Sequence, residues 1–260
     1  MVKRNLHLNK PIFPKTSKDA APPKQPYDYF MILDFEATCE KDDQDWPNEI
    51  IEMPIVVVDA VKNDIVAEFH SYVKPKKFGG KLTEFCVHLT GIQQATVDAA
   101  PTLEEVIESF NQWFQKTIPE GKSVMFVTDG PWDLREFMYH QAVVRDGVDF
   151  PPVFYHFVDL KAAFSTFIKC RTRNVTAMLE GLDMTFVGRQ HSGIDDARNI
   201  ARIFMKLHSL GCVFDNAVKV ETVAELAAVT KERRLARKLA KKEKQEKKAA
   251  RAATTGTKTQ

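Results

Sequence analysis

Five short runs of apolar residues predict the strands of one sheet. The runs cover residues 29–33, 50–58, 65–73, 124–127 and 154–158. Asn63 and Asp64 form a turn signal between the second and third runs, which predicts that these two strands pair as a hairpin. Pro54 lies inside the second run and cannot donate a ladder hydrogen bond, so we expect an edge or a bulge there.

Segments with helical periodicity lie between the later predicted strands. Thr102 and Glu105 have the spacing of a capping box, and apolar residues recur with a helical period from Val106 onward. Further helices are expected over about 131–144, 160–168 and 193–209, with a short one between Asn174 and Gly181. Three strands in a meander, followed by alternating strands and helices, predict a single α/β domain over residues 27–214. Its mixed five-stranded sheet would be flanked by helices on both faces.

Composition excludes several classes of protein. The chain has 260 residues, of which 44% are hydrophobic and 28% charged, and this excludes disorder along its whole length. No run of about 18 apolar residues occurs, so a membrane span is not expected. The cysteines form no C-x-x-C pair and follow no secretory segment, which favours a reducing cytoplasmic or nuclear compartment. They are Cys39, Cys86, Cys170 and Cys212.

The net charge of +2 conceals an uneven distribution. Residues 1–26 carry +5 and residues 231–260 carry +9, so the remaining 204 residues carry −12. Five prolines in 1–26 indicate an extended basic arm, and residues 215–260 form a C-terminal extension with a Lys/Arg-rich tail from 231. Such basic segments either contact nucleic acid phosphates or serve as solubilising or nuclear-import tails. Composition leaves both interpretations open.

Two acids follow the first predicted strand. Asp34 and Glu36 are two residues apart, so they lie on the same face of an extended chain while Phe35 faces the opposite layer. Buried carboxylates held side by side repel one another unless cations or protons compensate. Mg²⁺ prefers oxygen ligands and suits this role. The alternative is that both acids lie in a solvated loop.

A third acid appears after the fourth predicted strand. Asp133 falls in the first turn of the helix that follows residues 124–127, near the sheet edge where α/β sheets bind ligands. An acid at this position also complements a helix dipole, which is the structural alternative. Asp129 lies beside Gly130 and Pro131, where turn chemistry is the simpler interpretation.

A fourth acid belongs to the last predicted helix. Asp196 continues the apolar stripe of that helix, whereas Asp195 is rotated away by about 100°. Ser192 and Asp195 have the spacing of a capping pair. His191 precedes the helix and is either incidental or, beside inward acids, a general base.

Four motifs together resemble a known family. They are Asp34-Phe35-Glu36-Ala37-Thr38-Cys39, Leu89-Thr90-Gly91-Ile92, Thr128-Asp129-Gly130-Pro131-Trp132-Asp133 and the segment from His191 to Ile203. This combination is similar to the Eri-type 3′→5′ exoribonucleases, the DEDDh (DnaQ-like) branch that includes the histone mRNA 3′-end exonuclease. The resemblance covers residues 27–214 and implies an RNase H-like fold.

The resemblance also implies a reaction and a set of site residues. Two Mg²⁺ ions, replaceable by Mn²⁺, would clamp the scissile phosphate of an RNA 3′ end that is single-stranded or carries a short overhang. The implied metal ligands are Asp34, Glu36, Asp133 and Asp196. Glu36 and His191 are the implied catalytic residues, with His191 as general base.

Nucleotide contacts follow from the same resemblance. The backbone of Glu36 and Ala37, together with His191, would hold the terminal nucleotide. Phe85, Leu89 and Trp132 are candidates for stacking on bases, and core packing is their alternative role. Residues 1–26 are too short for the SAP domain of some members, so the choice among histone mRNA, ribosomal RNA and small interfering RNA stays open. A DNA exonuclease and a non-catalytic RNA-binding module are the competing functions, and no protein partner is predicted.

Overall fold

The computed structural model describes residues 23–43 and 45–225, and these contain one mixed sheet. Its strands are β1 (Tyr29–Leu33), β2 (Glu36–Ala37), β3 (Ile50–Asp59), β4 (Asp64–Tyr72), β5 (Val124–Thr128), β6 (His156–Asp159) and β7 (Val218–Lys219). The strand order is β2-β3-β1-β5-β6-β7, and β4 pairs with β3. β1, β5 and β6 are parallel, whereas β3 runs antiparallel to β1, β2 and β4. The predicted mixed α/β architecture is confirmed.

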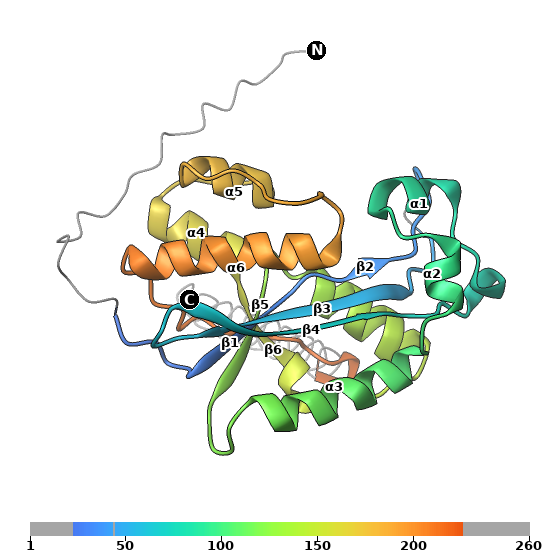
Figure 1. Cartoon of the computed structure of the whole chain (residues 1–260), viewed down its shortest axis with the longest axis horizontal. Coiled ribbons are helices and arrows are strands. Elements are labelled where there is room, and N and C mark those ends of the chain that lie inside the picture. Colours follow the sequence, from blue (N-terminus) through green and yellow to red (C-terminus); the bar gives the residue numbers. More distant parts are fainter. Residues whose placement is uncertain (1–22, 44, 226–260) are drawn as a thin grey trace, which may run out of the picture. The chain divides into compact units, whose positions relative to one another are not determined.

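Helices cover both faces of the sheet (Figure 1). They are η1 (Lys77–Gly80), α1 (Glu84–Thr90), α2 (Gln94–Asp98), α3 (Leu103–Thr117), η2 (Asp133–Arg145), η3 (Pro152–Tyr155), α4 (Leu160–Ile168), α5 (Val175–Gly181) and α6 (Gly193–Ser209). Strand β1 directs Phe30 and Ile32 towards α4, α5 and α6, and directs Met31 and Leu33 towards α3 and η2. This alternation divides the apolar core into two layers with the sheet between them.

The helices predicted from capping signals are confirmed. The side chain of Thr102 accepts a hydrogen bond from the backbone N–H of Glu105, and Glu105 reciprocates, so the capping box starts α3. Asn174 accepts a hydrogen bond from the N–H of Ala177 and starts α5. The predicted helix over 131–144 forms as η2, but with π-type hydrogen bonds such as that from the N–H of Asp146 to Gln141.

The sheet has two more strands than the five that were predicted. β2 and β7 are two residues long, too short to produce an apolar pattern. The predicted strand at 154–158 is shifted, because η3 occupies its first residues. Pro54 was expected at an edge or bulge, yet β3 is an interior strand. Pro54 pairs with β4, and on its other side it lies opposite the gap between β1 and β2.

The folded domain extends beyond the predicted limits of 27 and 214. At its start, the buried side chain of Gln25 donates to the carbonyl of Cys212 at 2.8 Å and accepts from the N–H of Phe214 at 3.0 Å. At its end, β7 pairs with β6, and the compact unit closes at Val220. Residue 221 begins a separate unit. The basic segments predicted in 1–22 and 231–260 lie outside the described residues.

Two further expectations concern cysteines and membranes. All four cysteines are free thiols, in agreement with the absence of a disulfide scaffold. Within 23–43 and 45–225, no helix combines the length and the apolar character that crossing a bilayer requires.

Candidate active site

The site is built at an interruption of the sheet. Asp34 and Phe35 lie between the end of β1 and the start of β2. Phe35 packs into the core layer of α3 and η2, on the opposite side from Asp34 and Glu36, as the alternation predicted. Its N–H donates to the carboxylate of Asp133, at the start of η2, over 2.8 Å. The interruption therefore links the first pair of acids to a third acid 98 residues away.

Five carboxylates converge there in two groups that share one member. The groups are Asp34, Glu36 and Asp196, and Asp34, Asp129 and Asp133. Within each group, one oxygen atom per residue lies within 4.8 Å of the others. The structure thus brings together all four acids that the sequence singled out, with Asp34 at the junction. The arrangement can hold two neighbouring cations that share one carboxylate.

Asp129 competed with Asp133 for a place in the site, but turn chemistry was the preferred interpretation, and the structure corrects that preference. Its backbone does belong to the turn, since its carbonyl accepts the N–H of Lys161 at 3.2 Å. Its carboxylate also forms an ion pair with the ammonium of Lys161, again at 3.2 Å, and lies in the acidic cluster. Neighbouring Gly130 and Pro131 favoured the turn interpretation, but the turn and the place in the cluster are compatible.

Burial and mutual repulsion hold protons on these acids. Burial, followed by the charge of Asp133, raises the pKa of Asp34 well above its usual range. Burial, followed by the charges of Asp196 and Glu52, raises the pKa of Glu36 to about 9. Burial is also the main reason that the pKa values of Asp133 and Asp196 rise to about 7. The cluster therefore favours compensation by positive charge over the fully ionised empty state.

These raised pKa values predict how the stability of the metal-free protein depends on pH. The metal-free folded protein should bind more protons than the unfolded chain between about pH 4 and the raised values of about 7 and 9. Its stability should therefore fall as the pH rises from about 5 to about 9, and a divalent cation should restore stability near pH 8 because it binds only the folded site. Thermal unfolding across this pH range, with chelator or with Mg²⁺, measures both effects. A pH-independent Tm in chelator would contradict the raised values, and Asp34→Asn should flatten the slope.

The first turn of α6 is held by Glu52, which the sequence analysis missed. Ser192 makes no side-chain capping bond, so the predicted pairing of Ser192 with Asp195 is wrong. Instead the carboxylate of Glu52, which is 1% exposed, accepts the N–H groups of Gly193 at 3.0 Å and Ile194 at 3.2 Å. His70 on β4 contacts the same carboxylate at 2.8 Å. An acid inside an otherwise apolar strand run was the available signal.

His191 lies at the mouth of the acidic cluster. It adopts a positive φ of 61°, an uncommon conformation for a residue other than glycine. Its N–H donates to the carboxylate of Asp196 at 2.7 Å, which fixes the backbone, while the residue remains exposed. Its side chain helps to line a cavity of about 210 Å³ together with Asp34, Asp129 and Asp196. The predicted general base is therefore beside the acids and open to solvent.

Arg189 connects the His191 segment to helix α1. Its guanidinium donates to the carbonyls of His88 and Leu89, both at 3.0 Å, and to that of Thr90. These carbonyls belong to the last turn of α1, where carbonyl groups have no N–H partner within the helix. Asp195 accepts the N–H of Arg189 at 2.9 Å, so the acid that faces away from the cluster organises this segment. A single arginine thus fixes α1 relative to His191.

The residues predicted to contact nucleotides lie on β2, on α1 and just before η2. Glu36 and Ala37 form β2 and are buried. Phe85 and Leu89 are one helical turn apart on α1, and both are half-buried. Trp132 is 61% exposed and lies edge-on to Phe137 at a centroid distance of 6.4 Å, so ordinary core packing does not account for it.

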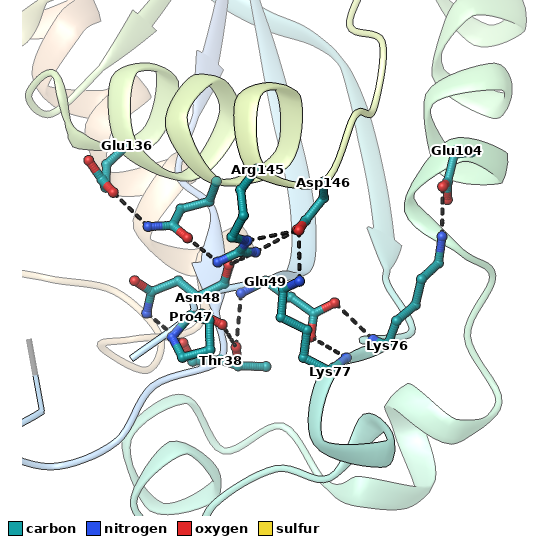
Figure 2. A network of polar contacts seen from close by, with 11 residues as sticks. Thr38, Pro47, Asn48, Glu49, Lys76, Lys77, Glu104, Glu136, Arg145 and Asp146 are labelled. Carbon is teal, nitrogen blue, oxygen red and sulfur yellow. Dashed lines mark hydrogen bonds and ion pairs between the residues drawn. The ribbon is translucent and has the colours of Figure 1, made fainter. Parts of the chain in front are cut away.

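A polar network supports the segment that leaves β2 (Figure 2). The amide of Asn48 donates to the carbonyl of Thr38 at 2.6 Å, and Arg145 at the end of η2 donates to the carbonyl of Asn48 at 2.7 Å. The N–H groups of Lys76 and Lys77 donate to Glu49 at 2.9 and 2.7 Å. The network joins the end of β2 to η2, the two elements that carry Glu36 and Asp133.

The donor atoms indicate which kind of cation fits. Both acidic groups consist of carboxylates alone, with no cysteine or histidine within them. Hard divalent cations select such oxygen donors, whereas softer transition metals favour nitrogen and sulfur. Once their protons are displaced, the five acids carry more negative charge than Lys161 offsets, and two divalent ions can neutralise the remainder. The residues present therefore fit a pair of hard divalent cations.

Comparison with known proteins shows that this chain is similar to nucleases. An exonuclease family model (RNase_T) matches residues 31–204. The chain is 41% identical over 201 residues to ERI1 exoribonuclease 3 of Homo sapiens, which covers 76% of this chain and 58% of that protein. It is 34% identical over 214 residues to the 3′-5′ exonuclease eri1 of Schizosaccharomyces pombe, covering 72% of this chain and 70% of that protein.

Solved structures agree with the sequence matches. The nuclease domain of 3′hExo, described as a DEDDh family member bound to rAMP, has a TM-score of 0.68 and 33% identity. The match covers 73% of this chain and 96% of that one. A 3′-exonuclease solved for its recognition of the histone mRNA stem-loop has a TM-score of 0.67 and 33% identity, covering 73% and 85%. The chain spans little more than half the length of the human relative.

Proposed function

Because this chain belongs to the exonuclease family, among relatives of the ERI1 and 3′hExo type, we propose that it is a divalent-metal-dependent 3′→5′ exoribonuclease. It would remove nucleoside 5′-monophosphates from RNA 3′ ends that are single-stranded or carry a short overhang. The observation that carries the proposal is the pair of carboxylate groups that share Asp34 and open beside His191.

The protein side of the reaction follows from the geometry. Asp34, Glu36 and Asp196 would hold one Mg²⁺, and Asp34 with Asp133 would hold a second, with Mn²⁺ as a substitute. When bound, such ions neutralise the scissile phosphate and lower the pKa of an attacking water. The imidazole of His191 would accept the proton of that water, since His191 is exposed at the cavity that the acids line.

The remaining site residues would hold the terminal nucleotides. The backbone of Glu36 and Ala37 would contact the last nucleotide beside the ions. Phe85 and Leu89 on α1, and Trp132 before η2, offer apolar surfaces on which bases can stack, at about 1–3 kcal/mol per base. Arg189 would act through α1, because its hydrogen bonds set the distance between this stacking surface and His191.

RNA is the proposed substrate because the relatives are named exoribonucleases, and one structure describes recognition of a histone mRNA stem-loop. The same acids would serve a DNA exonuclease, whereas a non-catalytic RNA-binding module has no use for five converging carboxylates. The cytoplasmic or nuclear location remains a prediction from the sequence. A role of the basic arm and tail in offsetting the −12 charge of the remaining chain is likewise untested.

A single time course tests polarity, product and metal requirement together. Matched RNA and DNA oligonucleotides, labelled at the 5′ or the 3′ end, are incubated with chelator, Mg²⁺ or Mn²⁺. We expect 3′-labelled RNA to release labelled mononucleotide first and 5′-labelled RNA to shorten progressively, only when a divalent ion is present. Faster degradation of DNA than of RNA would support the alternative function, a DNA exonuclease. Release of the 5′ label first would overturn the proposed 3′→5′ direction.

A further inference from the structure

The loop between α4 and α5 carries three cations and no acid. Residues 169–173, called the basic loop here, contain Lys169, Arg171 and Arg173, and all three side chains are exposed. Lys169 ends α4 in a left-handed conformation with φ of 58°, which turns the chain towards α5. The loop is therefore a short, fixed connection between two helices on one face of the sheet (Figure 1).

The basic loop leads directly into the acidic cavity. Asn174, Val175 and Thr176, the three residues that follow the loop, line the same cavity as Asp34 and His191. The side chain of Gln190 donates to the hydroxyl of Thr176 at 3.3 Å, which joins the start of α5 to the His191 segment. Arg173 is therefore the direct chain neighbour of a residue that lines the cavity, Asn174.

The cations of this loop form no ion pair among the described residues. Several other surface cations form ion pairs, for example Lys122 with Asp28 at 2.9 Å and Arg198 with Glu68 at 2.6 Å. In the part of the chain that the structure describes, none of the three loop cations lies within ion-pair distance of a carboxylate. Three like charges held close together repel one another, so an anion lowers their energy.

An acidic cavity that binds a polyanion needs positively charged side chains close by. The chain outside the basic arm and tail carries −12, and three of the five clustered carboxylates, those of Asp34, Asp129 and Asp196, line the cavity itself. Divalent ions neutralise charge at the scissile phosphate, but they do not reach the other phosphates of a longer strand. Arginine guanidinium groups bind phosphate through two parallel hydrogen bonds, and lysine binds it as a point charge.

We infer that Lys169, Arg171 and Arg173 form the surface that holds the backbone phosphates of RNA on the 5′ side of the scissile bond. This inference rests on the proposed function, because it names how that site retains a strand rather than a mononucleotide. The contact is made to the backbone, so it is independent of base sequence and depends on salt. It explains how a strongly acidic domain keeps hold of an RNA while its 3′ end is removed.

The test is a triple variant with Lys169→Gln, Arg171→Gln and Arg173→Gln. Fluorescence anisotropy of a labelled RNA about 20 nucleotides long, in chelator so that nothing is cleaved, gives Kd over a range of salt concentrations. The slope of log Kd against log salt should fall by about 2, because each of the three lost phosphate contacts contributes about 0.7 to it. With a divalent ion present, KM for the same RNA should rise about tenfold at moderate salt, with kcat unchanged.

Two controls separate this role from a change in net charge or in the catalytic site. The first is Lys62→Gln, Lys116→Gln and Lys206→Gln, which removes three exposed lysines that do not line the cavity and do not belong to the basic arm or tail. The second is a nitrophenyl ester of a nucleoside 5′-monophosphate, which has only the scissile phosphate and should be hydrolysed equally by parent and loop variant. Equal salt slopes in the two triple variants, or an unchanged slope in the loop variant, would overturn the inference. Because binding is measured without cleavage, an inactive parent would count against the proposed function alone.

Discussion

Replacing Asp34 by asparagine should lower the rate of RNA hydrolysis at least about 10³-fold, the largest loss expected from any single substitution. Asp34 is shared by both carboxylate groups, so its loss weakens both proposed ion sites at once. A loss of about 4 kcal/mol of transition-state stabilisation corresponds to this factor. Folding should be retained, since one of several repelling carboxylates is removed without a change of size. Rates with labelled RNA, calorimetric Mg²⁺ titrations and thermal unfolding give the three quantities.

The matched control for Asp34→Asn is Glu68→Gln. Glu68 lies on β4 and pairs with Arg198 on the surface, so its neutralisation should change activity and Mg²⁺ binding little. If Asp34→Asn degraded RNA at the parent rate, the assignment of the shared ligand would be wrong. If it lost activity but bound Mg²⁺ with the parent stoichiometry, Asp34 would act in some way other than holding an ion.

Replacing His191 by alanine should lower kcat by about 10²–10⁴-fold, the usual contribution of a positioned general base. Unlike Asp34→Asn, this change should leave Mg²⁺ binding in place, because only the backbone N–H of His191 contacts a carboxylate of the cluster. Single-turnover rates and calorimetric Mg²⁺ titrations measure the two effects.

Two further variants isolate the side chain of His191 from its strained backbone. Asparagine tolerates a positive φ better than most residues, so His191→Asn should keep the local conformation and be as slow as His191→Ala. His140→Ala removes an exposed histidine of η2 outside the cavity and should be neutral. Parent activity in His191→Asn would show that the segment needs the backbone shape and no base at this position.

Much of the fold could be predicted because its signals are local. The capping box of Thr102 and Glu105, and the apolar stripe that includes Asp196, mark α3 and α6 through neighbouring residues alone. β2 and β7 could not be found in this way. Two residues are too few to show a period, and each becomes a strand only because a longer strand lies beside it.

The candidate site likewise contains residues that have local sequence signals and residues whose roles depend on distant partners. Asp34, Glu36, Asp133 and Asp196 were predicted because they stand at recognisable ends of elements. Glu52, Asp129 and Arg189 perform tasks that exist only in three dimensions. Glu52 caps a helix 141 residues away, and Arg189 binds carbonyls about 100 residues earlier. Glu52 stands out as an acid inside an apolar run, and Asp129 as an acid at a turn. No local pattern encodes a partner at such a separation, so their tasks and that of Arg189 became visible only with the structure.

The break between β1 and β2 also sets an order of events for a chain under synthesis. The N–H of Phe35 turns to Asp133 instead of to an adjacent strand, and Asp196 arrives only when α6 docks. A polypeptide emerging from the ribosome exposes its first two acids long before their remaining partners exist. Under the proposed function, the set of metal-binding acids is complete only after Asp196 has been synthesised and α6 has docked on the sheet.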